Sequence, residues 1–117
     1  MVGRMSGIST HVLDLTRGKP AARVVVRLSR EANGHWSEVS KRTTDADGRV
    51  KTMLRENETL ESGRYRLHFE TAVYFRGQGI EAFHPFVEIA FEVRKADEHY
   101  HVPLLLTPHG YSTYRGN

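Results

Sequence analysis

The stretch FVEIAFEVR, residues 86–94, alternates apolar and polar side chains with a period of two. The apolar side chains fall on one parity of the numbering, at Val87, Ile89, Phe91 and Val93. The charged side chains fall on the other parity, at Glu88, Glu92 and Arg94. Because successive side chains of a β-strand point to opposite faces, this pattern predicts a strand with one face on a core and one in water.

The same alternation recurs on both sides of this stretch. Further strands are predicted over residues 8–15, 23–29, 36–44, 50–54, 64–70, 101–106 and 111–115. Turn-forming sequences separate them: RGKP at residues 17–20, ANG at 32–34, DADG at 45–48 and SG at 62–63. Short strands at this spacing predict an all-β fold, a two-sheet β-sandwich of seven or eight strands. Residues 71–77 instead fit one short helix, with Thr71 as N-cap, Arg76 in the last turn and Gly77 at the end.

The composition narrows the class of protein. With 117 residues the chain is expected to form one domain over residues 1–117, large enough to bury a core. It has no cysteine, which excludes disulfides, thiolate metal ligands and a cysteine nucleophile. No apolar run approaches the ~20 residues of a membrane helix, and the N-terminal residues lack the apolar centre of a secretory signal. We therefore expect a cytoplasmic protein that contacts no membrane.

The charge balance bears on the partners. Lysine and arginine number 17 against 14 aspartate and glutamate, a net charge of +3, and the basic residues are mixed with acidic ones. Nucleic-acid-binding proteins usually carry a clustered basic stripe, so no nucleic-acid partner is expected. A mild positive balance favours a small anionic ligand instead.

Three places carry reactive side chains that a plain β-sandwich does not need. His11 lies inside a predicted strand, and Arg49 directly follows the Asp-Gly pair of residues 47–48. His99 and His101 share one strand face. Each has an ordinary alternative, because a strand histidine is usually a surface or hydrogen-bonded residue and an arginine after a turn is a common surface charge. A more specific alternative is zinc, since the His-x-His spacing joined by His11 would supply three imidazole ligands.

The chain ends on Tyr114-Arg115-Gly116-Asn117, soon after an apolar run. Chain termini usually fray unless something ties them down, so we expect this end to belong to a site. The alternative is an edge strand that simply ends the protein.

Several longer motifs together resemble one protein family. They read STHVLD at residues 9–14, GKPA at 18–21, DGR at 47–49, FHPFV at 83–87, HYHVPLLL at 99–106 and YSTYRG at 111–116. In these motifs the chain resembles the 5-hydroxyisourate hydrolases, the transthyretin-related enzymes of urate degradation. The resemblance covers nearly the whole chain and implies a transthyretin-like two-sheet sandwich, which agrees with the strand pattern.

The resemblance also implies a function. It implies hydrolysis of 5-hydroxyisourate, a small anionic urate derivative, to 2-oxo-4-hydroxy-4-carboxy-5-ureidoimidazoline, with no metal and no cofactor. It implies a homotetramer, a dimer of dimers with active sites in the cleft between the dimers. By this resemblance the catalytic residues are His11, Arg49 and His101. Tyr114 and Asn117 join His11 and Arg49 in binding the substrate, and His99 is the less suitable catalyst.

The last residue departs from the family pattern. The family ends on Tyr-Arg-Gly-Ser, whereas this chain ends on Asn117. An asparagine amide donates and accepts hydrogen bonds but cannot relay a proton as a hydroxyl does. Asn117 therefore either substitutes for the serine by position or makes a slower enzyme. Two alternatives stay open: a non-catalytic, transthyretin-like tetramer that binds a small ligand, and a histidine-ligated metal hydrolase.

The side-chain types favour a mechanism of water attack. A neutral imidazole accepts a proton from water near pH 7, since the ordinary histidine pKa lies close by. Arg49 is permanently charged and forked, which suits a planar anion and a developing oxyanion. Tyr114 would position the substrate ring through its hydroxyl or its face. The sequence does not decide whether His11 or His101 is the base.

Overall fold

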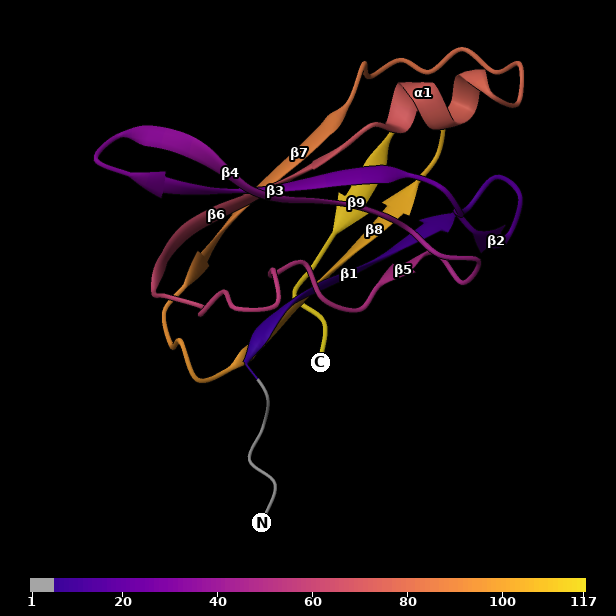
Figure 1. Cartoon of the computed structure of the whole chain (residues 1–117). Coiled ribbons are helices and arrows are strands. Elements are labelled where there is room, and N and C mark those ends of the chain that lie inside the picture. The colour runs from indigo at the N-terminus through magenta and orange to yellow at the C-terminus, as the bar shows by residue number, and fades with distance from the viewer. Residues whose placement is uncertain (1–5) are drawn as a thin grey trace.

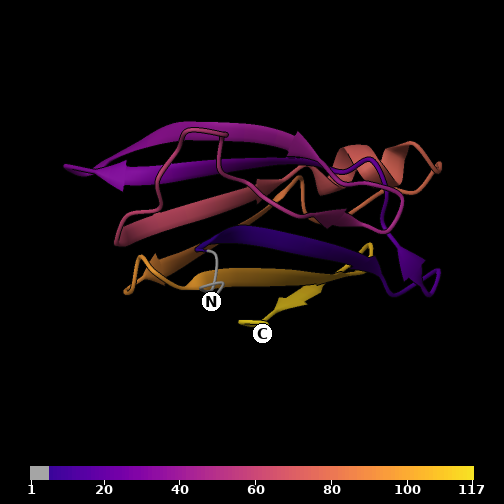
Figure 2. The same ribbon diagram turned by 60° about the horizontal axis from the view of Figure 1, so that its bottom comes forward.

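The computed structural model describes residues 6–117, which form two β-sheets and one short helix (Figure 1). In chain order the elements are β1 (Gly7–Asp14), β2 (Lys19–Pro20), β3 (Val25–Ala32), β4 (His35–Thr43), β5 (Arg49–Val50), β6 (Gly63–Phe69), α1 (Thr71–Arg76), β7 (Val87–Val93), β8 (His99–Leu106) and β9 (Tyr111–Thr113). Figure 2 shows the two sheets as stacked layers, with the yellow C-terminal strand in the same layer as β1 and β8. This arrangement is the predicted two-sheet sandwich.

The connectivity of the sheets brings distant parts of the chain together. One sheet is five-stranded, with the order β2-β1-β8-β9 and β5 also paired to β1. The other is four-stranded, with the order β4-β3-β6-β7. Paired strands run antiparallel except for β1 and β8, which run parallel in the centre of the five-stranded sheet. The two ends of the chain therefore meet in one sheet.

The core lies between the sheets and is filled by alternate residues of each strand. In β7, Val87 and Val93 are buried, whereas Ile89 and Phe91 are half-buried because β7 is an edge strand. The outward-facing Glu88 of the same strand is exposed. The prediction of a half-buried strand from the 86–94 pattern is confirmed.

Two short segments differ from their predictions. Residues 17–20, predicted as a turn, include the two-residue strand β2, which pairs with the end of β1. Of residues 50–54, predicted as a strand, only Val50 lies in β5, although the N–H of Met53 still donates to the carbonyl of Ile8. Among the described residues, seven strands contain at least three residues, in agreement with the predicted number.

The helix lies where it was predicted but begins differently. Glu70 is the N-cap residue, and no side chain caps the helix. Thr71 is buried in the first helical turn, and its hydroxyl has no hydrogen-bond partner among the described residues. The prediction of Thr71 as N-cap was wrong because this side chain is packed into the interior. Arg76 ends the helix and Gly77 is its C-cap, as predicted. No helix in residues 6–117 is long and apolar enough to cross a membrane.

Candidate active site

The outer face of the five-stranded sheet gathers the candidate residues. The parallel register places Ser9 opposite His101, and β5 places Arg49 opposite His11. The intervening residues Ile8, Thr10 and Val12 of β1 and Tyr100, Val102 and Leu104 of β8 are buried in the interior. Because side chains alternate between the faces of a sheet, His11, Arg49 and His101 all project from the outer face. The structure thus brings the three predicted catalytic residues to one surface.

A tight turn holds Arg49 beside His11. Asp45 accepts the N–H groups of Asp47 and Arg49 on its Oδ1 at 2.9 Å each. The N–H of Arg49 is the largest cause that lowers the pKa of the Asp45 carboxyl. Gly48 lies between them with a φ of +73°, and a Cβ at this position would lie 2.4 Å from the carbonyl oxygen of Val12. The turn therefore requires glycine, because it packs directly against β1.

The same turn fixes the orientation of His11. Its Nε2 lies 2.9 Å from the carbonyl oxygen of Asp47. A carbonyl oxygen only accepts, so the proton sits on Nε2, and Nδ1 of a neutral His11 carries the free lone pair.

The hydroxyl of Ser9 joins the other two histidines of the site. Its Oγ lies 2.7 Å from Nε2 of His99 and 2.7 Å from Nδ1 of His101. Ser9 is not among the site residues predicted from the sequence. Only the parallel register of β1 and β8 reveals its position, and the one signal in the sequence is that Ser9 belongs to the same STHVLD motif as His11.

The surroundings disfavour a positive charge on these two histidines. Burial lowers the pKa of His99. Burial also lowers the pKa of His101, and the nearby Arg49, His11 and His99 add to this effect because each disfavours a second positive charge. A neutral imidazole is the form that accepts a proton.

Arg49, His99 and His101 line a small hollow of about 220 Å³ at the surface, whereas His11 is not part of its lining. Its lining consists of Ser9, Thr10, Arg49, Val50, Lys51, His99, His101 and Asn117. Lys51 was not among the predicted site residues, because a lysine after a turn gives no sequence signal of its own. Lys51 and Arg49 each bring a positive charge to this hollow, which suits an anionic ligand.

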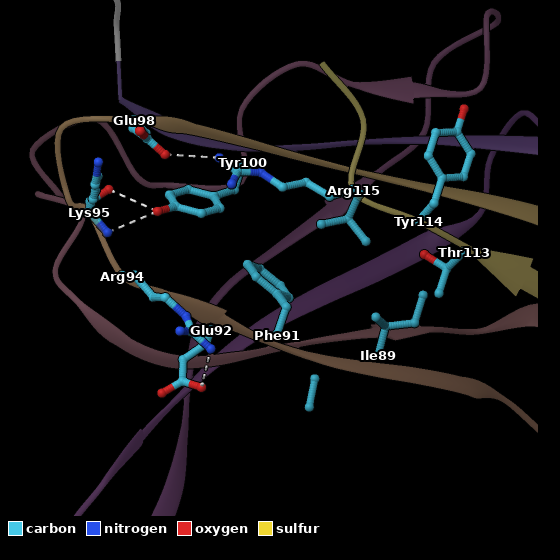
Figure 3. Close-up of a pocket in the computed structure, with 12 residues that line it drawn as sticks. Ile89, Phe91, Glu92, Arg94, Lys95, Glu98, Tyr100, Thr113, Tyr114 and Arg115 are labelled. Atoms are coloured by element: carbon cyan, nitrogen blue, oxygen red, sulfur yellow. Dashed lines mark hydrogen bonds and ion pairs between the residues drawn. The ribbon is translucent and has the colours of Figure 1, made fainter.

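The chain end packs directly on His101. The N–H of Gly116 donates to the carbonyl of His101 at 2.8 Å. The guanidinium carbon of Arg115 lies 4.3 Å from the centre of the Tyr100 ring, and its Nη2 donates to Oε1 of Glu98 at 3.1 Å (Figure 3). These contacts tie down the terminus and place Asn117 in the hollow beside His101.

Tyr114 lies elsewhere in the single chain. Its side chain is exposed and lines a second hollow of about 510 Å³ between β7 and the β8–β9 edge. Figure 3 shows Ile89, Phe91 and Tyr100 along this second hollow, with the Tyr114 ring at one side. The predicted residues therefore separate: Asn117 lies with His101 and Arg49, whereas Tyr114 faces the gap between the sheet edges.

The three-histidine zinc arrangement is not assembled. Within residues 6–117, no group of three or more His, Cys, Asp or Glu side chains is placed to share a metal ion. The Ser9 hydroxyl bridges the ring nitrogens of His99 and His101, and His11 is turned to the Asp47 carbonyl.

Comparison with known proteins shows the family to which this chain belongs. A family model described as "HIUase/Transthyretin family" matches residues 8–116. The chain belongs to this family. Among its members, a 5-hydroxyisourate hydrolase of Caulobacter vibrioides is 45% identical to it, over 97% of this chain and 100% of that protein.

Solved structures of the HIUase/Transthyretin family have the same fold. The chain is similar to the 5-hydroxyisourate hydrolase of Klebsiella pneumoniae, with a TM-score of 0.85, 39% identity, and coverage of 97% of this chain and 100% of that chain. It is also similar to sea bream transthyretin in complex with thyroxine, with a TM-score of 0.85, 32% identity and 93% of each chain covered. The family thus includes a protein named as a hydrolase and a protein solved with bound thyroxine. The residues of the site must therefore decide between hydrolysis and ligand binding for this chain.

Proposed function

We propose that this protein hydrolyses 5-hydroxyisourate to 2-oxo-4-hydroxy-4-carboxy-5-ureidoimidazoline in urate degradation. The observation that carries the proposal is the grouping of His11, Arg49 and His101 on one outer sheet face. Relatives named 5-hydroxyisourate hydrolase support it, since they are 41–45% identical over most of this chain. Imidazoles beside a guanidinium suit the proton transfers and the developing oxyanion of a hydrolysis, which a protein that only binds a ligand does not need.

The reaction follows from the side chains. A neutral histidine takes one proton from water as the oxygen forms a bond to the ring carbonyl carbon of the substrate. The carbon–nitrogen bond of the six-membered ring then breaks, and the proton passes to the leaving nitrogen. The Arg49 guanidinium stabilises the negative oxygen that develops at that carbon. No covalent intermediate and no metal is required.

Two histidines are available for the proton transfers. His101 lies in the hollow with Arg49, and its lowered pKa keeps it able to accept a proton. His11 has Nδ1 as its free nitrogen because Asp47 holds Nε2. We assign His101 as the base, and His11 as the residue that orients water or protonates the leaving nitrogen. Asn117, in the same hollow, would hold a polar edge of the substrate.

We further propose a homotetramer, a dimer of dimers. Among the described residues, β7 and β9 each have one sheet neighbour, and both flank the 510 Å³ hollow, so each presents an edge to a second copy. Leu15, 54% exposed, lies at the end of β1 beside the outer face that carries the histidines, where a facing dimer would cover it. A facing dimer would also narrow the open 220 Å³ hollow into a cleft, although Tyr114 of the same chain lines the other hollow. We propose a cytoplasmic location, which the absence of cysteine suits.

A direct assay tests the catalytic proposal. Urate oxidase generates 5-hydroxyisourate from urate, and its ultraviolet absorbance is followed with and without this protein. We expect faster decay with the protein, in proportion to its concentration. An unchanged decay, together with binding of a small aromatic anion by calorimetry, would favour the non-catalytic tetramer. That second candidate is kept because Asn117 stands where the family has serine.

A further inference from the structure

The bridge made by Ser9 has a consequence for the protons of both rings. Oγ lies 2.7 Å from Nε2 of His99 and 2.7 Å from Nδ1 of His101. A hydroxyl carries one hydrogen, so it can donate to only one of these nitrogens. When both rings are neutral, the other nitrogen must carry a hydrogen and donate to the Ser9 oxygen. The tautomers of the two histidines are therefore coupled through one side chain.

The strand register creates the space for this bridge. Ser9 lies opposite His101, and Gly7 lies opposite His99. A Cβ on Gly7 would be 3.4 Å from Nδ1 of His99, so the lack of a side chain there leaves room for the ring. Ser9 itself is only 7% exposed, so water competes little for its hydroxyl.

One of the two proton arrangements suits catalysis. If Ser9 donates to His99, Nδ1 of His101 donates to Ser9, and Nε2 of His101 keeps its lone pair. Among the described residues, Nε2 of His101 has no hydrogen-bond partner, so this lone pair can accept a proton from water. In the opposite arrangement Nε2 carries the hydrogen, and His101 cannot act as a base there.

We propose that Ser9 is a positioning residue, held by His99, that fixes His101 in the tautomer with a hydrogen on Nδ1 and a free Nε2. When Nε2 takes the proton of water, the imidazolium keeps its Nδ1–H bond to Ser9, and no hydroxyl has to rotate. His99 acts by accepting the Ser9 hydrogen, so it must stay neutral. The kinetic part of this inference rests on the proposed function, whereas the tautomer part does not.

The charges around both rings are compatible with this arrangement. His101 is approached by Arg49 from β5 and by His11 from β1, and both disfavour a second proton on its ring. His99 has Glu98 beside it in the chain, and its backbone carbonyl accepts from Arg115. Lys51 and the terminal Asn117 also line the shared hollow. Burial lowers the pKa of His99, which favours the neutral acceptor.

Nitrogen NMR of the histidine-labelled protein tests the tautomers directly. At a pH where both rings are neutral, we expect the hydrogen on Nδ1 in both His99 and His101. A hydrogen on Nε2 of either ring in the unchanged protein would overturn the proposal. In Ser9→Ala, His101 should lose this preference and show the Nε2–H form.

The variant His99→Phe separates tautomer control from simple packing. Phenylalanine keeps a planar ring but offers no acceptor, so the Ser9 hydroxyl is free to donate to His101. We expect His101 to change to the Nε2–H form although Ser9 is intact. Retention of the Nδ1–H form in folded His99→Phe would contradict the role of His99.

Kinetics provide the second readout. General-base catalysis contributes about 10²–10⁴ in rate, so Ser9→Ala should lower kcat at least about tenfold with little change in KM. Ser9→Thr keeps the hydroxyl and should restore most of kcat. Ser37→Ala, an exposed serine of β4 in the other sheet, serves as the matched control and should leave kcat unchanged. Equal kcat in Ser9→Ala and in the unchanged enzyme would contradict the role of Ser9. If neither the unchanged protein nor any variant hydrolyses the substrate, the proposed function is refuted. The NMR result then decides whether Ser9 sets the tautomer of His101.

Discussion

The backbone N–H of Gly116 donates to the carbonyl of His101, and the lack of a side chain at Gly116 leaves room for the His101 ring. A Cβ at Gly116 would lie 2.6 Å from Cδ2 of that ring and 3.3 Å from Cγ of Pro103. The chain end and the proposed base are thus in direct contact.

Gly116→Ala should therefore displace His101 or the chain end. A misplacement of about 1 Å can cost about 10²-fold in rate, so we expect a fall in kcat of that order, measured by 5-hydroxyisourate decay. Gly110→Ala is the matched control, since the nearest atom to its Cβ is 3.9 Å away and its turn lies outside the hollow. Equal activity of the two variants would show that the contact at Gly116 has no catalytic effect.

Arg49→Ala should lower kcat/KM about a hundredfold or more, because a donor to the developing oxyanion is lost. Arg49→Lys should recover only part, since lysine keeps the charge but not the planar fork. Arg55→Ala, an exposed loop arginine paired with Glu58, is the control of equal charge change. A loss in Arg55→Ala as large as in Arg49→Ala would point to overall charge instead of local contact.

The pH profile of kcat/KM should reflect the lowered pKa of His101. Burial, and after it the charge of Arg49, disfavour the protonated ring, so the neutral base persists as the pH falls below the ordinary histidine pKa of about 6.5. We expect activity to be constant around neutral pH and to fall only below that value. In Arg49→Ala the remaining activity should fall at a higher pH, because one cause of the lowered pKa is gone. An acid limb above about 6.5 in the unchanged enzyme would contradict this assignment.

Asn117→Ser should raise kcat or leave it unchanged, because serine restores a hydroxyl where the family has one. A large fall in kcat would show that the asparagine amide has a role of its own.

The terminal residue lines the hollow, so a C-terminal extension should lower activity more than an N-terminal one. Equal impairment by the two extensions would argue against this placement.

Elemental analysis of the purified protein checks the metal alternative. We expect far less than one zinc ion per chain, and we expect that a chelator does not lower the activity. Stoichiometric zinc that is required for activity would restore the metal hydrolase, with histidine positions different from those described above.

Much of this architecture could be predicted from local patterns. The alternation in residues 86–94 places each side chain on a face, because pleating is a property of neighbouring residues. The position of His11 within a strand and the turn before Arg49 could also be predicted from neighbouring residues alone. Their meeting on one face followed from the family resemblance, and the register confirms it.

The remaining features depend on contacts between distant residues. The bridge from Ser9 to His99 and His101 requires the parallel pairing of strands some ninety residues apart in the chain, which no local pattern encodes. The packed side chain of Thr71 overrode its capping preference for the same reason. Lys51 entered the hollow because the chain leaves β5 there.

The parallel pairing of β1 and β8 also bears on how the protein is made. As the chain leaves the ribosome, β1 has only its short neighbours β2 and β5 to pair with until β8 follows. Pairing over such a separation is slow, because the loop must close before any contact forms. The face that carries the histidines is therefore complete only once β8 has been made, and a chain that stops before β8 leaves an edge of β1 unpaired and open to pairing with other chains.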